Sequence, residues 1–245
     1  MDDEGRSTYP GWFEEALRIE LPGEGGSVSI GDRDFIMRNG LLRDSQIDDE
    51  MQRQTSESFG YKWSRTETYK SESVLNATRA WLVERYGDLS RPECWNRFGK
   101  YPLVLDCGCG SGLTARLLIG DALKAIHYVG ADISVAVDVA SETFCTEGRP
   151  GAFMQADLYH LPFPTETFDF ILSEGVLHHT PSTREAIQRV APLLKRGGEI
   201  AFYVYAKKAP YIREFTDDSI RSKLAKLDPG DAWEALMSLT KLGNV

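Results

Sequence analysis

Three glycines that alternate with small residues are the first feature of this sequence with the types and spacing to do chemistry. Gly108, Gly110 and Gly112 follow the run Leu103–Cys107, which is apolar except for Asp106. This pattern predicts a short buried strand and a tight turn into a helix, because glycine accepts positive φ and lets a ligand approach the backbone. We expect the turn to aim free N–H groups at a bound molecule. A tight turn without a ligand is the structural alternative.

Two classes of cofactor compete for this turn. The dinucleotide fingerprint G-x-G-x-x-G needs a third glycine at the position of Leu113. The stretch instead resembles motif I of class I S-adenosylmethionine-dependent methyltransferases, D-x-G-x-G-x-G, and the resemblance continues to about residue 206. It implies S-adenosylmethionine as the cofactor, with the loop around its amino-acid and ribose portions and Asp106 near the methionyl ammonium. A nicotinamide oxidoreductase is the alternative.

Carboxylates follow the next two predicted strands. Asp132, in VGADIS, can accept hydrogen bonds from both hydroxyls of a ribose. Alternatively, Asp132 or Ser134 caps the helix that follows. Asp157 lies where a lone aspartate is commonly a turn residue. Its loop, D-L-x-x-L-P-F, resembles that of methyltransferases related to the quinone-biosynthesis enzymes, which implies Asp157 near the adenine amine and the Leu158 N–H facing a ring nitrogen.

The fourth predicted strand runs into SEGVLHHT, residues 173–180. The resemblance implies a pocket floor there, beside the methionyl group. His178 is the candidate catalytic base, because an imidazole of near-neutral pKa can take a proton from a hydroxyl or an amine. Packing of His178 and His179 at the start of a helix is the structural alternative. The predicted cofactor-binding residues are Asp106, Gly108, Cys109, Gly110, Gly112, Asp132, Ile133, Ala156, Asp157, Leu158, Ser173, Glu174 and Gly175.

Regular alternation of strands and helices must position these residues. We expect strands at 103–107, 127–133, 153–156, 169–173 and 199–205. We expect helices at 113–124, 134–146 and 183–195, the last capped by Gly197 and Gly198. This spacing predicts an α/β fold, with a Rossmann-like parallel sheet of five or more strands and helices on both faces. The resemblance implies the strand order 3-2-1-4-5. Ligands of such sheets lie beyond the carboxyl ends of the strands, where the residues named above fall.

The flanks divide the chain into an extension at 1–58, a helical lid segment at 59–100, the core at 101–206 and a helical segment at 207–245. The extension contains a short helix at 12–19 and a strand–turn–strand pattern at 27–44, with Asn39-Gly40 as a hairpin signal. The lid segment carries FGYKW and an amphipathic helix at 73–86. Its aromatic residues either seat the segment on the core or, by resemblance, form a lid over the cofactor and acceptor.

The C-terminal segment departs from the family. Class I enzymes usually add two strands after the fifth, but residues 207–245 predict helices. The fifth strand, EIAFYVYA, would then be an edge prone to pairing. We expect it to be covered by a neighbouring chain in a homodimer, by the C-terminal helices, or by the hairpin at 27–42. Either the sequence stops short of a longer enzyme or the protein lacks these two strands. The lack of the strands favours the alternative of a cofactor-binding protein that does not methylate.

Composition limits the partners. The 245 residues carry a net charge of −9, which argues against nucleic acid and anionic membranes as partners. The polar N-terminus and the lack of a long apolar run predict a cytoplasmic protein. Four cysteines without C-x-x-C or zinc spacing predict free thiols and no metal. The sequence therefore predicts a methyltransferase that acts on a small-molecule acceptor.

Overall fold

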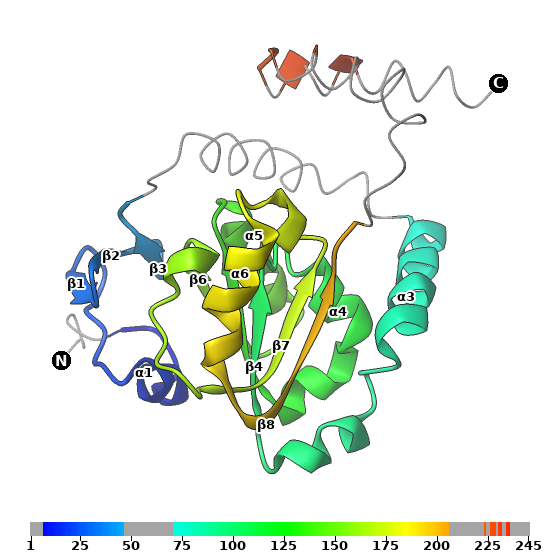
Figure 1. The fold of residues 1–245 in the computed structure, drawn as a ribbon, viewed down its shortest axis with the longest axis horizontal. Coiled ribbons are helices and arrows are strands. Elements are labelled where there is room, and N and C mark those ends of the chain that lie inside the picture. The colour runs from blue at the N-terminus through cyan, green and yellow to red at the C-terminus, as the bar shows by residue number, and fades with distance from the viewer. Residues whose placement is uncertain are drawn as a thin grey trace. The chain divides into compact units, whose positions relative to one another are not determined.

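Five neighbouring parallel strands, the last of them at one edge, belong to an eight-stranded sheet in the computed structural model (Figure 1). They are β4 (Leu103–Cys107), β5 (His127–Asp132), β6 (Ala152–Gln155), β7 (Phe168–Glu174) and β8 (Leu194–Tyr203). Their spatial order is β6-β5-β4-β7-β8, and each neighbouring pair is parallel. Numbered within the core, this is 3-2-1-4-5, so the predicted fold class is confirmed. The strand before the glycine turn lies in the middle.

The structure describes residues 7–46 and 71–205, together with residues 223, 226–228, 230, 231, 234 and 235. Residues 1–204 form one compact unit and residues 205–245 a second. The predicted FGYKW lid at 59–63 and most of the predicted C-terminal helices lie outside the described residues. Among the described residues, no helix is both long and apolar enough to cross a membrane.

Helices cover both faces of the sheet and enclose two hydrophobic cores. On one face pack α3 (Glu72–Tyr86), α4 (Leu113–Leu118) and α5 (Ala136–Thr146), and on the other pack α1 (Gly11–Leu17) and α6 (Thr183–Val190). Neighbouring side chains of a strand point to opposite faces. Val104 of β4 therefore belongs to the core under α4 and α5, whereas Leu105 belongs to the core under α1 and α6.

The N-terminal extension lengthens this sheet. Strands β1 (Ser27–Ile30), β2 (Arg33–Arg38) and β3 (Leu41–Asp44) form an antiparallel meander, and β3 pairs in parallel with β6. The meander therefore occupies the edge opposite β8, and the expectation that the hairpin covers the fifth strand is wrong. The physical reason is burial, because Phe35, Met37 and Leu42 of the meander join the core under α1 and α6.

Two helix ends differ from the sequence prediction. The α-helix α6 ends at Val190 because Pro192 has no N–H to continue it, and a 3₁₀ turn leads directly into β8. Gly197 and Gly198 therefore lie inside β8 instead of capping the helix. Similarly, α4 ends at Leu118 and continues as 3₁₀ turns to Ala125.

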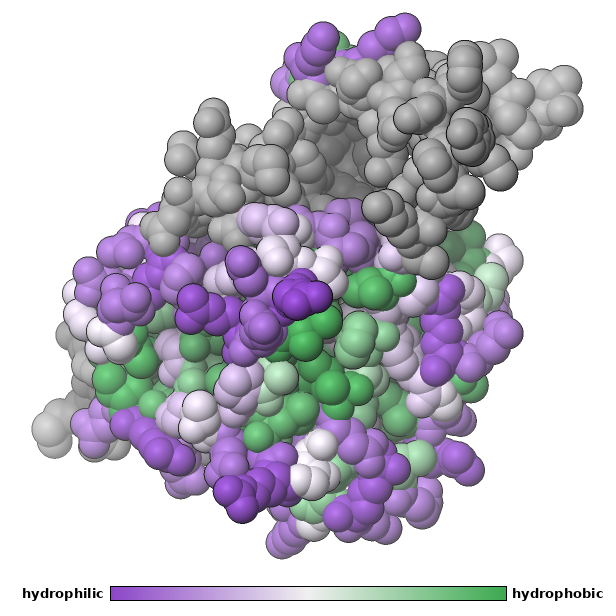
Figure 2. Space-filling model, in the orientation of Figure 1, coloured by the Kyte–Doolittle hydropathy of each residue, from purple (hydrophilic) through white to green (hydrophobic). Residues whose placement is uncertain are grey.

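Strand β8 is an edge within the described residues. It pairs with β7, and no described strand pairs with its other side. Figure 2 shows hydrophobic surface at the middle of the face on which α6 and β8 lie, ringed by hydrophilic side chains. Phe202 of β8 is 40% exposed. A neighbouring chain and the C-terminal helices stay the predicted covers of this edge.

Candidate cofactor and catalytic site

The glycine loop after β4 is tied to β5 by its own backbone. Gly108, Gly110 and Gly112 have φ of +79°, +53° and +75°. The N–H groups of Gly108 and Cys109 donate to the Ala131 carbonyl at 2.7 and 3.1 Å, and the N–H of Gly112 donates to the Cys109 carbonyl at 2.9 Å. The expectation of free N–H groups is therefore wrong for these three, because buried donors need partners and the end of β5 supplies one.

Two of these glycines are required by packing. A Cβ on Gly108 would lie 2.3 Å from the Val176 side chain, and one on Gly112 would lie 2.7 Å from Phe144. Both distances are far below van der Waals contact. The loop can therefore approach the turn after β7 and helix α5 only because these two side chains are absent.

Asp132 at the end of β5 holds the loop in place. Its Oδ2 accepts from the Gly110 N–H at 2.8 Å, and its Oδ1 accepts from the N–H and hydroxyl of Ser134 at 2.8 and 2.7 Å. The Ser134 hydroxyl in turn accepts from the Ala136 N–H at the start of α5. A carboxylate has about four acceptor positions, so Asp132 can accept further donors. The Ile133 carbonyl next to it accepts from the Gln155 side chain at 3.0 Å.

Asp106 lies below this loop, within the electrostatic influence of two other carboxylates, Asp132 and Glu174. Asp106 is 1% exposed and accepts from the Tyr128 hydroxyl at 2.8 Å. Burial, together with the negative charges of Asp132 and Glu174, raises the pKa of Asp106 to about 7, although the Tyr128 hydrogen bond lowers it. Burial also raises the pKa of Asp132 and of Glu174. A cationic group placed here would relieve the repulsion, so the site suits an ammonium or sulfonium ligand.

Helix α3 contributes to the candidate site a residue, Tyr86, that the sequence analysis did not single out. The Tyr86 hydroxyl donates to Glu174, and burial and this bond raise the pKa of Tyr86. Arg85 lies against the rings of Trp81 and Tyr203, with its guanidinium carbon 3.6 and 3.7 Å from the ring centroids. The contacts of Tyr86 with Glu174 and of Arg85 with Tyr203 join helix α3 to the ends of β7 and β8, so no local spacing predicts them.

The apolar face predicted for this helix is largely exposed. Leu82 is the buried residue of α3, whereas Val74 and Trp81 are 41% and 38% exposed.

In the turn after β7, Ser173 holds two strands together and Gly175 faces space that the described residues leave open. The buried Ser173 hydroxyl donates to the Cys107 carbonyl at 3.0 Å and ties β7 to β4. Gly175 has φ +70°, and among the described residues no atom beyond its chain neighbours lies within 4 Å of where its Cβ would be. His178 follows on a 3₁₀ turn, is half-buried, and has its pKa lowered by burial. Its ring lies 4.2 Å from that of the exposed His179.

The Asp157 loop lies beside Asp132. The Ala156 N–H donates to the Asp132 carbonyl at 2.9 Å, so the ends of β5 and β6 are joined. Asp157 is 5% exposed, and its Oδ1 accepts from the Tyr159 N–H at 3.0 Å, which starts a 3₁₀ turn at Leu158. The turn role and a ligand role are compatible, because a carboxylate accepts several donors.

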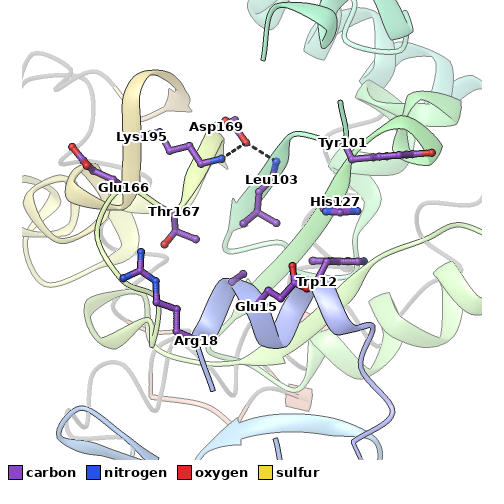
Figure 3. Close-up of a pocket in the computed structure, with 11 residues that line it drawn as sticks. Trp12, Glu15, Arg18, Tyr101, Leu103, His127, Glu166, Thr167, Asp169 and Lys195 are labelled. Carbon is purple, nitrogen blue, oxygen red and sulfur yellow. Dashed lines mark hydrogen bonds and ion pairs between the residues drawn. The ribbon is translucent and has the colours of Figure 1, made fainter. Parts of the chain in front are cut away.

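A cavity of about 320 Å³ lies at the other end of the sheet (Figure 3). It is beside the amino ends of β4 and β5, and the His127 ring is stacked between Trp12 and Tyr101 at centroid distances of 4.6 and 5.4 Å. None of the predicted site residues lines it. Parallel sheets bind ligands at their carboxyl ends, so the glycine loop stays the candidate site.

Potential metal ligands and thiols were located in the described part of the chain. No three His, Cys, Asp or Glu side chains are grouped there to hold an ion. The four cysteines, Cys94, Cys107, Cys109 and Cys145, are free thiols.

The strand order and the glycine loop define a Rossmann-like α/β domain, and comparison with known proteins gives the family of this domain. Residues 105–202 match the family model described as a methyltransferase domain. This domain belongs to the class I S-adenosylmethionine-dependent methyltransferases.

Curated relatives cover the same region. The uncharacterized methyltransferase YodH of Bacillus subtilis is 36% identical over 107 residues, which are 44% of this chain and 45% of that protein. YcgJ of the same organism is 31% identical over 149 residues, or 57% of this chain and 56% of that protein. A tRNA U34 carboxymethyltransferase of Hydrogenovibrio crunogenus is 35% identical over 108 residues, 40% of this chain and 30% of that protein. The chain thus spans about half or less of the length of these relatives. The crystal structure of YcgJ superimposes with a TM-score of 0.43 at 30% identity, covering 50% of this chain and 53% of that one.

Proposed function

We propose that the chain binds S-adenosylmethionine at the carboxyl ends of β4–β7 and transfers its methyl group to a small-molecule acceptor. The observation that carries this proposal is the cluster of Asp106, Asp132 and Glu174. Burial, together with the negative charges of Asp132 and Glu174, raises the pKa of Asp106 to about 7. The cofactor carries two positive charges, an ammonium and a sulfonium, and either would stabilise the ionised cluster.

Each part of the cofactor has residues suited to it. Asp106 and Glu174 face the amino-acid portion, and Asp132 has acceptor capacity for the ribose hydroxyls. Asp157 accepts the adenine amine, and the Leu158 N–H faces the ring. The remaining members of the proposed pocket are Gly108, Cys109, Gly110, Gly112, Ile133, Ala156, Ser173 and Gly175.

The bound cofactor supplies an electrophilic methyl group. The chain's contribution is to hold the acceptor in line with that methyl and to exclude water from the site. His178 serves as the base, because burial lowers its pKa and keeps the imidazole neutral at pH 7. Open space at Gly175 leaves room for a ligand beside it.

The cofactor assignment is tested by calorimetry with S-adenosylmethionine. Asp132→Ala removes a charged acceptor and should weaken binding by about 2–3 kcal/mol. Ser134→Ala is the matched control, since it removes the hydroxyl that bonds Asp132 and the Ala136 N–H but keeps the carboxylate. Equal affinity of wild type and Asp132→Ala would overturn the assignment.

The acceptor class is tested by turnover. The net charge of −9 favours a small molecule over a nucleic acid. The relative named for tRNA makes a tRNA acceptor the competing outcome. Transfer of labelled methyl to a panel of small hydroxyl, amine and carbon acceptors supports the proposal, and transfer to bulk tRNA alone overturns the acceptor class. Cofactor binding without transfer to either identifies a binding protein that does not methylate.

A further inference from the structure

The last turn of α3 is anchored on the core beside the candidate site. Leu82 is 1% exposed, and the partly buried Val83 and Tyr86 pack against the core under α4 and α5. Gly87 ends the helix directly afterwards, with φ +77° and its N–H donating to the Val83 carbonyl at 2.9 Å. The packed turn and the glycine stop together fix where the backbone of Tyr86 lies.

A single hydrogen bond from this turn holds the side chain at the end of β7. The Tyr86 hydroxyl donates to Oε2 of Glu174, the last residue of that strand. Within the described residues, the Glu174 carboxylate has no other hydrogen-bond or ion-pair partner. The charge of Arg85 lowers the pKa of Glu174, but the Arg85 guanidinium is stacked on the rings of Trp81 and Tyr203.

The hydrogen bond has two effects on the Glu174 carboxylate. It restricts the rotation of a half-buried side chain, and a group that is fixed in advance loses less conformational entropy when a ligand binds. It also favours the ionised form, since it lowers the pKa of Glu174 against the burial that raises it. A carboxylate has about four acceptor positions, so Glu174 can accept from Tyr86 and from a ligand at the same time.

A second carboxylate lies within electrostatic reach of this pair. The charge of Glu174 contributes to the raised pKa of Asp106, and the charge of Asp106 contributes to the raised pKa of Tyr86. The three groups therefore belong to one region, at the carboxyl ends of β4 and β7. A primary ammonium has three donors and one positive charge, which suits it to a site with two carboxylates.

We propose that Tyr86 is a positioning residue for the amino-acid portion of the cofactor: it holds the Glu174 carboxylate ready to accept the methionyl ammonium. This inference rests on the proposed function, in which S-adenosylmethionine binds at the carboxyl ends of β4–β7. It gives helix α3, which lies outside the residues 105–202 that match the family model, a part in recognising the cofactor.

The test compares two ligands that differ at one group. S-adenosylhomocysteine carries the amine, and its deamino analogue carries a hydrogen in place of the amine. Calorimetry should show that wild type prefers S-adenosylhomocysteine by roughly 10-fold or more, the scale of a hydrogen bond to a charged group. Tyr86→Phe keeps the ring that packs on the core but removes the donor, and should lower this preference by about 3-fold or more.

Glu174→Gln tests whether Tyr86 acts through Glu174. The amide oxygen can still accept from Tyr86, but it offers no charge to an ammonium. Glu174→Gln should therefore lower the preference at least as much as Tyr86→Phe, and the double variant should show no further fall. A further fall in the double variant overturns the inference. A full preference in Glu174→Gln also overturns it, even if Tyr86→Phe fails to fold.

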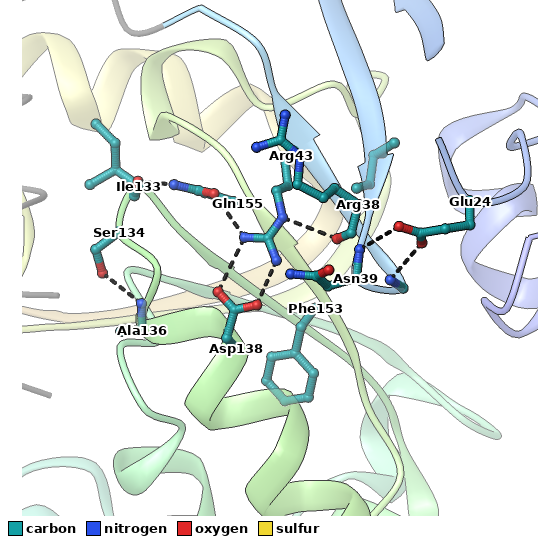
Figure 4. Close-up of polar contacts among 12 residues, drawn as sticks. Glu24, Arg38, Asn39, Arg43, Ile133, Ser134, Ala136, Asp138, Phe153 and Gln155 are labelled. Atoms are coloured by element: carbon teal, nitrogen blue, oxygen red, sulfur yellow. Dashed lines mark hydrogen bonds and ion pairs between the residues drawn. The ribbon is translucent and has the colours of Figure 1, made fainter. Parts of the chain in front are cut away.

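Two variants control for a loss of stability alone. Val83→Ala reduces packing in the same turn of α3, and Arg43→Met removes the contacts of Nη2 with Asp138 at 2.5 Å and of Nη1 with Gln155 at 3.0 Å (Figure 4). Neither side chain has a described hydrogen bond or ion pair with Glu174. Both variants should lower the free energy of unfolding and preserve the preference. A preference that falls as far in either control as in Tyr86→Phe overturns the inference.

The outcomes separate this inference from the proposed function. Wild type that binds neither ligand overturns both. Wild type that binds the two ligands equally overturns the inference and leaves cofactor binding in place. Wild type that prefers S-adenosylhomocysteine, with the same preference in Tyr86→Phe, overturns the inference alone.

Discussion

At the scale of single residues, Asp106 is the group whose ionisation reports most directly on the site. Its pKa is raised to about 7 by burial and by the carboxylates of Asp132 and Glu174. A bound ammonium favours the ionised form, so binding of S-adenosylhomocysteine near pH 7 should release part of a proton. Calorimetry in buffers of different ionisation enthalpy measures this release. Asp106→Asn should abolish it, and a binding enthalpy independent of the buffer would contradict the prediction.

The Asp106 carboxyl group also predicts the direction in which the free energy of unfolding changes with pH. Its folded pKa of about 7 lies above the unfolded value, so the folded state binds the extra proton between pH 4 and 7. The free energy of unfolding of the ligand-free protein should therefore fall as pH rises through this window, by about 4 kcal/mol at most from this group. Urea denaturation at pH 5 and pH 7.5 gives the difference, which Asp106→Asn should reduce.

His178 and His179 form a matched pair for testing the base. His178 is half-buried with a lowered pKa, whereas His179 is exposed. His178→Ala should lower turnover at least about 100-fold and change cofactor affinity little, as expected of a general base. His179→Ala should change neither the turnover nor the cofactor affinity strongly. Equal turnover of both variants and wild type would assign His178 to packing.

The residues named from the sequence lie where their motifs predict, at the carboxyl ends of β4–β7. This is because each motif sits directly after its own strand, so the local spacing fixes its place. Tyr86 escaped the sequence analysis for the opposite reason. Its partner, Glu174, is 88 residues away, and only the packed structure brings the two together.

At the scale of elements, the glycine loop depends on close packing as much as on backbone freedom. Gly108→Ala places a Cβ 2.3 Å from Val176 at φ +79°. We expect a loss of about 2–4 kcal/mol in the free energy of unfolding, from the left-handed backbone and the overpacking together. Adding Val176→Ala should recover the overpacking part of that loss. Urea denaturation measures both variants.

Gly148→Ala separates the cost of the left-handed backbone from the cost of overpacking. Gly148 has φ +62°, and in the part of the chain that the structure describes no atom beyond its chain neighbours lies within 4 Å of its Cβ position. We therefore expect only the backbone cost of about 1–2 kcal/mol. An equal loss in Gly108→Ala and Gly148→Ala would show that the contact with Val176 contributes nothing.

The element boundaries show where local patterns stop being informative. Periodicity predicted the helix at 183–195, yet Pro192 ends it early and the following glycines become part of β8. The sequence also predicted a hairpin at 27–44 but not its neighbour in the sheet. Either edge of a parallel sheet offers the same backbone groups, so the choice depends on which core the meander's apolar side chains fill.

At the scale of the whole molecule, the pairing of β3 with β6 joins the N-terminal extension to the methyltransferase core. Phe13 of α1 is fully buried, stacks on Tyr9 at 4.4 Å and meets the edge of Phe163 at 6.0 Å. The Tyr9 hydroxyl in turn donates to the Phe153 carbonyl of β6 and accepts from the Leu42 N–H of β3. The extension and the core thus share one set of buried contacts.

This sharing predicts that the two parts unfold together. Phe13→Ala leaves a cavity in the core that includes Leu105 of β4, and should cost about 3–5 kcal/mol. Val74→Ala, at a 41% exposed position of α3, is the control and should cost less than about 0.5 kcal/mol. Hydrogen exchange followed by mass spectrometry should show the same loss of protection in peptides covering β2 and β4 of Phe13→Ala, because a single cooperative unit loses stability throughout. Loss confined to β2, with β4 protected as in wild type, would mean that the extension is a separate unit that can detach from an intact core.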